Sequence, residues 1–245
     1  MKSGSTTLVL LSYDEREALE RLLPMVPFDR FDAVLAIDAG STDGTLALYD
    51  ARSIPYRIQS ARGRGNAFQL ASQIVMTERI VFLSTDGNED PRDLPRMLQY
   101  LDEGYDVVIA GRFMLPGARS DDSDDPLRLR KLGNIVYSLI VRLLWRSGVR
   151  DSINGYRAFT VEALRRMQLD APLHEIELQS TIRAAKLGMR IKEFPTRELP
   201  RLGGYRKPSA ASWTLGWRIG AFLLREIVIG RRFITPTNRQ VDTNK

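Results

Sequence analysis

The stretch FLSTDGNEDP, at positions 82–91, contains the side chains whose types and spacing best suit metal chemistry. An apolar segment is followed at once by a short acidic loop, and Asp86 lies just past the apolar part. A divalent metal that binds a diphosphate needs hard oxygen ligands and coordination positions left open for the phosphates. Asp86 is the best single ligand in this loop, and Asn88, Glu89 and Asp90 are further candidates.

Asp90 has an alternative role because Pro91 follows it. Aspartate is favoured at the residue that caps a helix, and proline is favoured in the first helical turn. We therefore assign Asp90 mainly to a helix start and Asp86 to chemistry. The apolar segment before Asp86 predicts a buried strand, and ligands bind beyond the carboxyl ends of such strands in open α/β sheets.

The motif IDAGSTDGT, at 37–45, places polar groups at the end of a second apolar run. Asp38 can accept a hydrogen bond from a base or a ribose, and Gly40 permits a tight turn. Ser41 or Asp43 can cap the following helix. An ordinary strand-turn-helix junction explains this motif equally well.

Two more motifs are weak when each is taken alone. In ARGRGNA, at 61–67, backbone N–H groups and Arg62 or Arg64 could meet an anion at a helix start. DSINGYRAF, at 151–159, forms a polar cluster before an apolar strand, an arrangement that is commonly structural. The polar members of this second motif are Asp151, Asn154 and Arg157.

The elements that must position these side chains alternate between strands and helices. Apolar β-type runs lie near 7–11, 33–38, 55–59, 79–83, 105–111, 155–159 and 190–195. Helical patterns lie near 15–23, 44–51, 65–77, 92–102, 127–147, 174–188 and 210–230. This alternation predicts an α/β protein with a doubly wound, mostly parallel central sheet. The segment 113–126 has no period and is expected to be a long exposed loop.

Composition sets further bounds on function. The chain has 245 residues, 43% of them hydrophobic, which is enough for one α/β domain with a full core. It has no cysteine, so thiol nucleophiles and zinc-thiolate sites are excluded, and His174 is its only histidine. The first residues form neither a signal-peptide core nor a membrane span. We expect a cytoplasmic protein, or a peripheral one at the inner face of the membrane.

The net charge of +6 indicates polyanionic partners. Nucleic acid ranks last among these, because two of the three basic clusters have few aromatic residues on which bases could stack. The clusters are 128–131, 197–207 and 225–232.

In this order and spacing, the motifs resemble the family-2 glycosyltransferases with the GT-A fold, particularly the polyprenyl-phosphate hexose synthases. The resemblance covers about residues 7–209. It implies a GT-A domain at 1–209, with a nucleotide-sugar half at 1–111 and an acceptor half at 112–209, followed by an amphipathic helix and tail at 210–245. The landmarks are SYDERE, IDAGSTDGT, RGRGNA, STDGN, VVIAGR, RLRK, DSINGYRAF, EIELQ and RLGGYRK.

The resemblance also implies roles for individual residues. Asp86 and Asn88 would hold Mg²⁺ or Mn²⁺ on the diphosphate of a nucleotide sugar. The nucleoside and donor side would use Tyr13, Glu15, Asp38, Gly40, Arg64 and Gly65. The phosphates of donor and acceptor would be clamped by Arg112, Arg130 or Lys131, Arg201 and Lys207.

Two positions depart from the pattern of this family. Ser84 replaces the first acid of the metal-binding Asp-x-Asp motif, and Ala39 replaces the second acid of the usual Asp-Asp-Gly-Ser motif. Loss of a carboxylate either weakens metal binding or requires another group to substitute for it. Asp86 alone could suffice, because Mg²⁺ is often held by one or two carboxylates together with phosphates and waters.

The implied reaction is direct displacement at the anomeric carbon, in which a hexose moves from a GDP- or UDP-linked donor to a polyprenyl phosphate at the cytoplasmic membrane face. An ionised phosphate acceptor needs no general base. A hydroxyl acceptor would need one, and Glu175, Glu177 and Asp151 are the candidates. Both glutamates fit the start of a helix equally well. A hydroxyl acceptor and a non-catalytic nucleotide-binding protein remain the alternatives.

The segment 212–233 is amphipathic and interrupted by arginines, so it is not a simple transmembrane helix. Its Trp, Leu and Arg residues suit a helix that lies in a membrane interface. Packing on its own domain, or on a second subunit of a homo-oligomer, fits this pattern about equally well. The helix at 134–145 has the same two interpretations.

Overall fold

The structure is a computed structural model that describes residues 4–114, 129–203 and 211–233, without the side chains of 129–131 and 211–216. Seven strands form one sheet in the order β3-β2-β1-β4-β6-β5-β7. All neighbours pair in parallel except β6, which is antiparallel to both β4 and β5. The strands are β1 (Thr6–Ser12), β2 (Ala33–Asp38), β3 (Tyr56–Ile58), β4 (Arg79–Ser84), β5 (Val107–Gly111), β6 (Arg157–Thr160) and β7 (Ile191–Pro195). The predicted mostly parallel central sheet is therefore confirmed.

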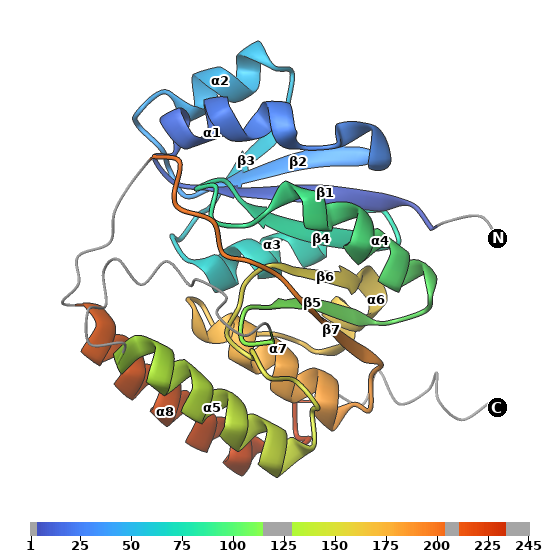
Figure 1. Ribbon diagram of the computed structural model, residues 1–245, viewed down its shortest axis with the longest axis vertical. Coiled ribbons are helices and arrows are strands. Elements are labelled where there is room, and N and C mark those ends of the chain that lie inside the picture. Colours follow the sequence, from blue (N-terminus) through green and yellow to red (C-terminus); the bar gives the residue numbers. More distant parts are fainter. Residues whose placement is uncertain (1–3, 115–128, 204–210, 234–245) are drawn as a thin grey trace.

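Helices cover both faces of this sheet (Figure 1). They are α1 (Arg16–Leu22), α2 (Thr45–Ala51), α3 (Arg64–Ile74), α4 (Leu94–Asp102), α5 (Leu129–Trp145), α6 (Val161–Arg166), α7 (Glu175–Lys186) and α8 (Ala211–Ile229). Three short 3₁₀ turns occur at Leu23–Met25, Phe28–Arg30 and Pro91–Asp93. Helix α6 was not predicted from the sequence. Its six residues are too few to show a clear period, and Thr160, the last residue of β6, caps it by accepting a hydrogen bond from the Ala163 N–H group.

Among the element boundaries that differ from the prediction, two have a clear local reason. The helix expected at 65–77 ends at Ile74, because Val75 adopts an extended backbone and is buried. The helix expected at 92–102 begins with a 3₁₀ turn, in which the Asp90 side chain accepts a hydrogen bond from the Arg92 N–H group. Asp90 therefore has the capping role that the sequence favoured for it.

The core has a layer on each face of the sheet. Alternate residues of a strand point to opposite faces, so Leu8 and Leu10 belong to the layer that α1 and α4 cover, whereas Val9 belongs to the layer under α3 and α7. In the second layer the rings of Phe68 and Phe82 stack with centroids 3.8 Å apart. These layers fix the strands whose carboxyl ends form the candidate site.

Helices α5 and α8 lie side by side at one end of the molecule, against α7 (Figure 1). A third apolar cluster joins them and contains Val141 of α5, Ile182 of α7, and Ile219 and Leu223 of α8. Within the described ranges, neither of these two helices nor any other is long and apolar enough to span a membrane.

Candidate active site

The carboxyl ends of three parallel strands bring the predicted site residues to one edge of the sheet. Ser12 at the end of β1 pairs with Asp38 at the end of β2, and Leu11 pairs with Ser84 at the end of β4. Tyr13 directly follows β1, and Asp86 follows β4 by two positions. The topology therefore gathers residues that lie as many as 73 positions apart in the sequence, such as Leu11 and Ser84.

Asp38 organises the turn after β2. Its side chain is fully buried. One carboxylate oxygen accepts hydrogen bonds from the N–H groups of Gly40 and Ser41 at 2.8 and 2.6 Å, and the other accepts from the hydroxyls of Ser12 and Ser41 at 2.9 and 2.6 Å. Gly40 has a φ of +87°, which favours glycine. The carboxylate is thus committed to shaping the turn that lines the site.

The loop between β4 and the 3₁₀ turn at Pro91, residues 85–90, is called the Asp86 loop and carries oxygen atoms suited to a cation. Asp86 is partly buried, and its Oδ1 atom accepts a hydrogen bond from the Asn88 N–H group at 3.1 Å. The Oδ1 atom of Asn88 is buried and accepts no hydrogen bond from any residue of the described ranges. Gly87, with a φ of +82°, packs so closely on Leu202 that a Cβ atom would lie 2.5 Å from the leucine Cγ atom. A buried amide oxygen that accepts no hydrogen bond, next to a carboxylate, fits a hard divalent ion.

Arg201 connects this loop to the loop after β1. Its guanidinium donates to Asp86 Oδ2 at 2.8 Å and to Glu15 Oε1 at 2.5 Å. Burial raises the pKa of Glu15 to about 7, although Arg201 opposes that shift. The chain that carries Arg201 follows β7 and runs back across the sheet (orange in Figure 1), where the Leu202 N–H group donates to the Asp86 carbonyl at 3.0 Å.

Arg112, at the end of β5, is also held by carboxylates. It forms two side-chain hydrogen bonds to Asp151, at 2.8 and 3.1 Å, and lies 3.6 Å from Glu198. Asp151 is fully buried, and burial alone would raise its pKa, but Arg112 outweighs burial and holds the pKa below its ordinary range. Asp151 therefore fixes Arg112 and is poorly suited to serve as a general base.

Arg64 lies beneath the Asp86 loop. Its guanidinium donates to Ser84 Oγ at 2.9 Å and forms ion pairs with Glu89 at 3.4 Å and Glu177 at 2.6 Å. Gly155 leaves room for this side chain, because a Cβ atom there would collide with the guanidinium. The charge of Arg64 is thus balanced by carboxylates of the chain itself.

The remaining predicted residues lie in varied surroundings. Gly65 packs against the Ala171 carbonyl, with no room for a Cβ atom, so packing requires this glycine. The Arg62 guanidinium lies 3.6 Å from the centre of the Tyr13 ring. Arg130 and Lys131 fall in the first turn of α5, where side chains are not described, and Lys207 lies outside the described residues.

The two glutamates considered as bases are both ion-paired near the start of α7. Glu175 lies 2.6 Å from Arg218 of α8, and Glu177 lies 2.6 Å from Arg64. His174 immediately precedes the helix, at the start of the helical pattern expected near 174–188. The interpretation of both glutamates as residues of a helix start is confirmed, and their ion pairs link α8 through α7 to Arg64.

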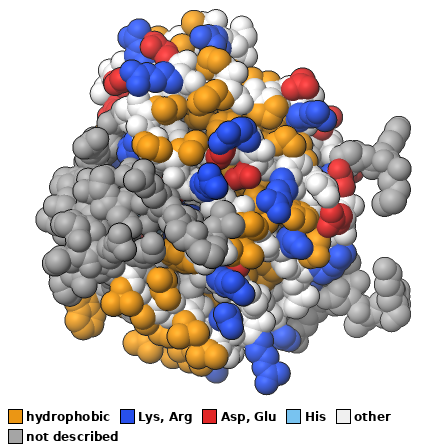
Figure 2. Space-filling view, viewed as in Figure 1, with side chains coloured by type: hydrophobic (Ala, Val, Ile, Leu, Met, Phe, Trp, Pro, Cys, Tyr) orange, Lys and Arg blue, Asp and Glu red, His pale blue; other side chains and the backbone are white. Residues whose placement is uncertain are grey.

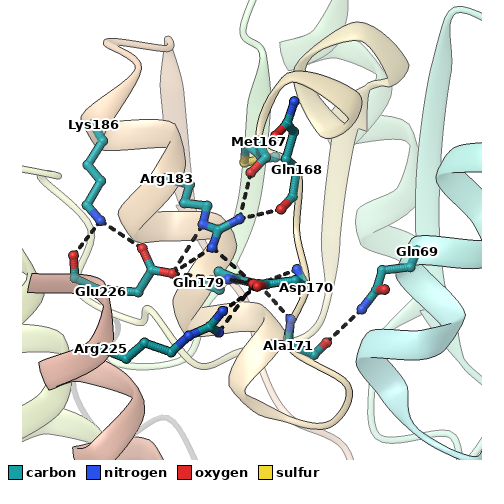
Figure 3. Close-up of polar contacts among 10 residues, drawn as sticks. All are labelled: Gln69, Met167, Gln168, Asp170, Ala171, Gln179, Arg183, Lys186, Arg225 and Glu226. Atoms are coloured by element: carbon teal, nitrogen blue, oxygen red, sulfur yellow. Dashed lines mark hydrogen bonds and ion pairs between the residues drawn. The ribbon is translucent and has the colours of Figure 1, made fainter. Parts of the chain in front are cut away.

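A buried polar network fastens α8 to α7 and was not predicted from the sequence (Figure 3). Glu226 of α8 is fully buried and accepts hydrogen bonds from Arg183 at 2.9 and 3.1 Å, from Lys186 at 2.7 Å and from Gln179 at 3.1 Å. Arg225 pairs with Asp170 in the loop before α7. Because the partners lie about forty positions apart, their sequence pattern gives no sign of the contact.

Comparison with known proteins agrees with this geometry. The model of "Glycosyl transferase family 2" matches residues 8–167, which is more than half of the chain, so the chain belongs to that family. Glycosyltransferase AglJ of Haloferax volcanii is 33% identical over 79% of this chain and 62% of its own length. The chain spans only 33% of the length of glycosyltransferase AglD of the same organism.

Two further relatives have names that refer to a polyprenol or to undecaprenyl phosphate. Polyprenol monophosphomannose synthase of Mycolicibacterium smegmatis is 29% identical, with 84% of this chain and 82% of the relative covered. Undecaprenyl-phosphate mannosyltransferase of Micrococcus luteus is 30% identical, with 82% of this chain and 86% of the relative covered. Among solved structures, the chain is similar to glucosyl-3-phosphoglycerate synthase of Mycobacterium tuberculosis, which was crystallised with Mn²⁺, UDP-glucose and phosphoglyceric acid. The two superpose with a TM-score of 0.70 at 20% sequence identity, and the match covers 91% of this chain and 79% of the other. This likeness shows the GT-A fold.

Proposed function

We propose that this protein transfers a hexose from a GDP- or UDP-linked donor to a polyprenyl phosphate at the cytoplasmic face of a membrane. The donor would bind at the edge formed by β1, β2 and β4. Tyr13 and Glu15 would face the nucleoside, and the Asp38 turn would line its pocket. Two relatives named for polyprenyl or undecaprenyl acceptors support the lipid acceptor.

The Asp86 loop would hold Mg²⁺ or Mn²⁺ through Asp86 and Asn88, whose buried Oδ1 atom accepts no hydrogen bond from a described residue. A divalent ion bound there neutralises charge on the departing diphosphate. The guanidinium of Arg201, now paired with Glu15 and Asp86, lies next to this position and can donate to the same diphosphate oxygens. Arg112 would bind phosphate on the acceptor side.

The reaction needs no proton transfer from the acceptor. An oxygen of the ionised acceptor phosphate forms a bond to the anomeric carbon, and the bond from that carbon to the diphosphate oxygen breaks, so the nucleoside diphosphate leaves with the electron pair. A hydroxyl acceptor would instead require a general base. The candidates Asp151, Glu175 and Glu177 all form ion pairs, which favours the phosphate acceptor.

The observation that carries the lipid part of the proposal is the outer face of α5 and α8. In a helix packed on a soluble domain, the apolar side normally faces inward. Here Ile219 and Leu223 of α8 are buried together with the charged Glu226, whereas Trp217, Leu224 and Val228 are 80%, 63% and 74% exposed. Figure 2 shows apolar side chains gathered at the lower edge of the molecule, where Figure 1 places these helices. Helix α5 adds exposed Leu132, Ile135, Val136, Leu139, Leu143 and Leu144.

This apolar surface lies close to the candidate site. Arg218 of α8 pairs with Glu175, and two residues further along α7 Glu177 pairs with Arg64 beside Ser84. A helix pair with an outward apolar face can rest in the interface of a bilayer. We therefore propose that α5 and α8 hold the site next to the headgroup of a lipid phosphate.

The test is sugar transfer with radiolabelled GDP-mannose, GDP-glucose, UDP-glucose and UDP-galactose, each with and without Mn²⁺ and with a polyprenyl phosphate in detergent. We expect metal-dependent label in the lipid fraction with one of these donors. Transfer to a soluble hydroxyl compound, without any need for lipid phosphate, would contradict the proposed acceptor. Binding of nucleotide with no transfer to any acceptor would contradict the enzymatic function.

A further inference from the structure

The carboxylate of Glu89 lies against Ser84, the position at which the family pattern has an acid. Its Oε2 atom accepts a hydrogen bond from the Ser84 N–H group at 2.6 Å, and its Oε1 atom accepts one from Ser84 Oγ at 2.9 Å. Only five positions separate the two residues, so the loop closes on itself. A carboxyl group therefore stands beside residue 84 although that residue is a serine.

The position of the Glu89 carboxyl group depends on Arg64. The Glu89 side chain is 10% exposed and the Arg64 side chain 17% exposed, and their charged groups lie 3.4 Å apart. The same guanidinium donates to Ser84 Oγ at 2.9 Å, so Arg64, Ser84 and Glu89 form a closed ring of contacts. Removal of one charge from a buried pair leaves the other uncompensated, which is costly.

The contacts among Arg64, Ser84 and Glu89 lie at the two ends of the stretch that carries the proposed metal ligands. Asp86 and Asn88 lie between Ser84 and Glu89 in the sequence, and the hydrogen bonds of Glu89 to Ser84 tie the two ends of that stretch together. Groups that orient metal ligands in this manner commonly change metal affinity by about 10- to 100-fold when they are altered.

We propose that Glu89 replaces the missing acid of the Asp-x-Asp motif as a positioning residue. It supplies the carboxyl group that position 84 lacks, and through Ser84 and Arg64 it keeps the loop closed so that Asp86 and Asn88 present their oxygens together. This inference rests on the donor-and-metal part of the proposed function and does not depend on the acceptor.

The test moves the carboxyl group within the loop. Glu89→Gln replaces the carboxyl group by an amide and keeps the shape of the side chain, and Ser84→Asp together with Glu89→Gln returns the acid to position 84. Glu162→Gln serves as the control because Glu162 is 78% exposed. Calorimetry measures binding of Mn²⁺ with UDP, and separately with GDP, in the absence of any acceptor. Thermal unfolding of each variant without ligand reports folding.

We expect Glu89→Gln to weaken Mn²⁺ binding in the nucleotide complex by about 10- to 100-fold. The double variant should recover affinity to within about threefold of the unaltered protein, and the control should not change. A general structural role for Glu89 would not predict this recovery. Unchanged affinity in Glu89→Gln, or a double variant that binds no better than Glu89→Gln, would overturn the inference while the proposed function stands. Failure of the unaltered protein to bind either nucleotide with Mn²⁺ would overturn both.

Glu89→Ala provides a second, independent measurement. Hydrogen exchange of the peptide that spans 84–90 reports directly on loop closure, because the Ser84 N–H group loses its acceptor. We expect exchange of this peptide to accelerate at least tenfold while peptides of β1 keep their protection. Equal exchange in this variant and the unaltered protein would show that Glu89 does not hold the loop.

Discussion

Arg201 donates a hydrogen bond of 2.8 Å to Asp86, although 115 positions separate the two residues in the chain. The contact brings the segment after β7 over the loop after β4, and the Leu199 and Leu202 N–H groups donate to the carbonyls of Asn88 and Asp86 in the same place. In the proposed complex, nucleotide and metal would share Asp86 with Arg201 or shift this arginine onto the diphosphate. The pair makes Asp86 the first residue to test.

Replacement of Asp86 should abolish metal-dependent binding of nucleotide. We expect Asp86→Ala to reduce sugar transfer at least 100-fold, which corresponds to about 2.7 kcal/mol of transition-state stabilisation. Asp29→Ala is the matched control, because Asp29 is 81% exposed on a 3₁₀ turn. Initial transfer rates at saturating Mn²⁺ measure the effect. A variant that transfers sugar at the rate of the control would show that Asp86 holds no metal.

The Glu226 network should determine whether α8 stays on the domain. Glu226→Ala leaves Arg183 and Lys186 without their buried carboxylate, so we expect a loss of about 3–5 kcal/mol in the free energy of unfolding. Glu20→Ala, which breaks a surface pair with a 48% exposed glutamate, should cost no more than about 1 kcal/mol. Urea denaturation compares the two variants. Equal midpoints would mean that the network contributes little to stability.

Substitutions on the outer face of α8 should weaken membrane binding without affecting the fold. Leu224 and Val228 are exposed, and each would bury a side chain worth about 1.5–3 kcal/mol if it entered the bilayer fully. Replacement of both by Ser should lower partitioning into vesicles that contain anionic lipid at least tenfold.

The control for this measurement is Met76→Ser. Met76 is 90% exposed and lies between α3 and β4, outside α5 and α8. Flotation of the protein with vesicles, at fixed lipid concentration, measures the partitioning. Equal flotation of the double variant and the control would count against the membrane-facing role of α8, and gel filtration would then show whether this face joins two copies of the chain.

Stability without ligand should fall as pH rises from about 5 to about 7. Burial raises the pKa of Glu15 and of Glu89 from 4.5 to about 7, despite the opposing effects of Arg201 and Arg64. Between these two pKa values the folded protein binds more protons than the unfolded chain, so a rise in pH favours unfolding. Each carboxyl contributes a slope of at most about 1.4 kcal/mol per pH unit.

Urea denaturation at several pH values measures this slope. Glu15→Gln removes one of the two titrating groups, so the decline over this window should become shallower. Nucleotide should bind more tightly as pH rises through the same range if it requires ionised Glu15. A stability that increases between pH 5 and 7 would contradict the raised pKa values.

Much of the fold followed from local sequence patterns. The apolar runs that became β1, β2 and β4 were visible because buried parallel strands need continuous hydrophobic segments. The positions of Asp38 and Asp86 followed as well, since each comes at or just after the end of such a run. The direction of β6 did not, because an apolar run of four residues does not specify whether it pairs parallel or antiparallel.

The sequence by itself determined the order of the strands and of the helices other than α6, the acidic loop after β4 and the departure at Ser84. Only the tertiary structure decided what those residues contact. Arg201 meets Glu15 across 186 positions, and Glu226 meets Arg183 across 43. Such ion pairs depend on how the layers pack and leave no periodic trace in the chain. Ser84 is the example in which both contribute, because the sequence shows a missing acid and the fold places Glu89 beside it.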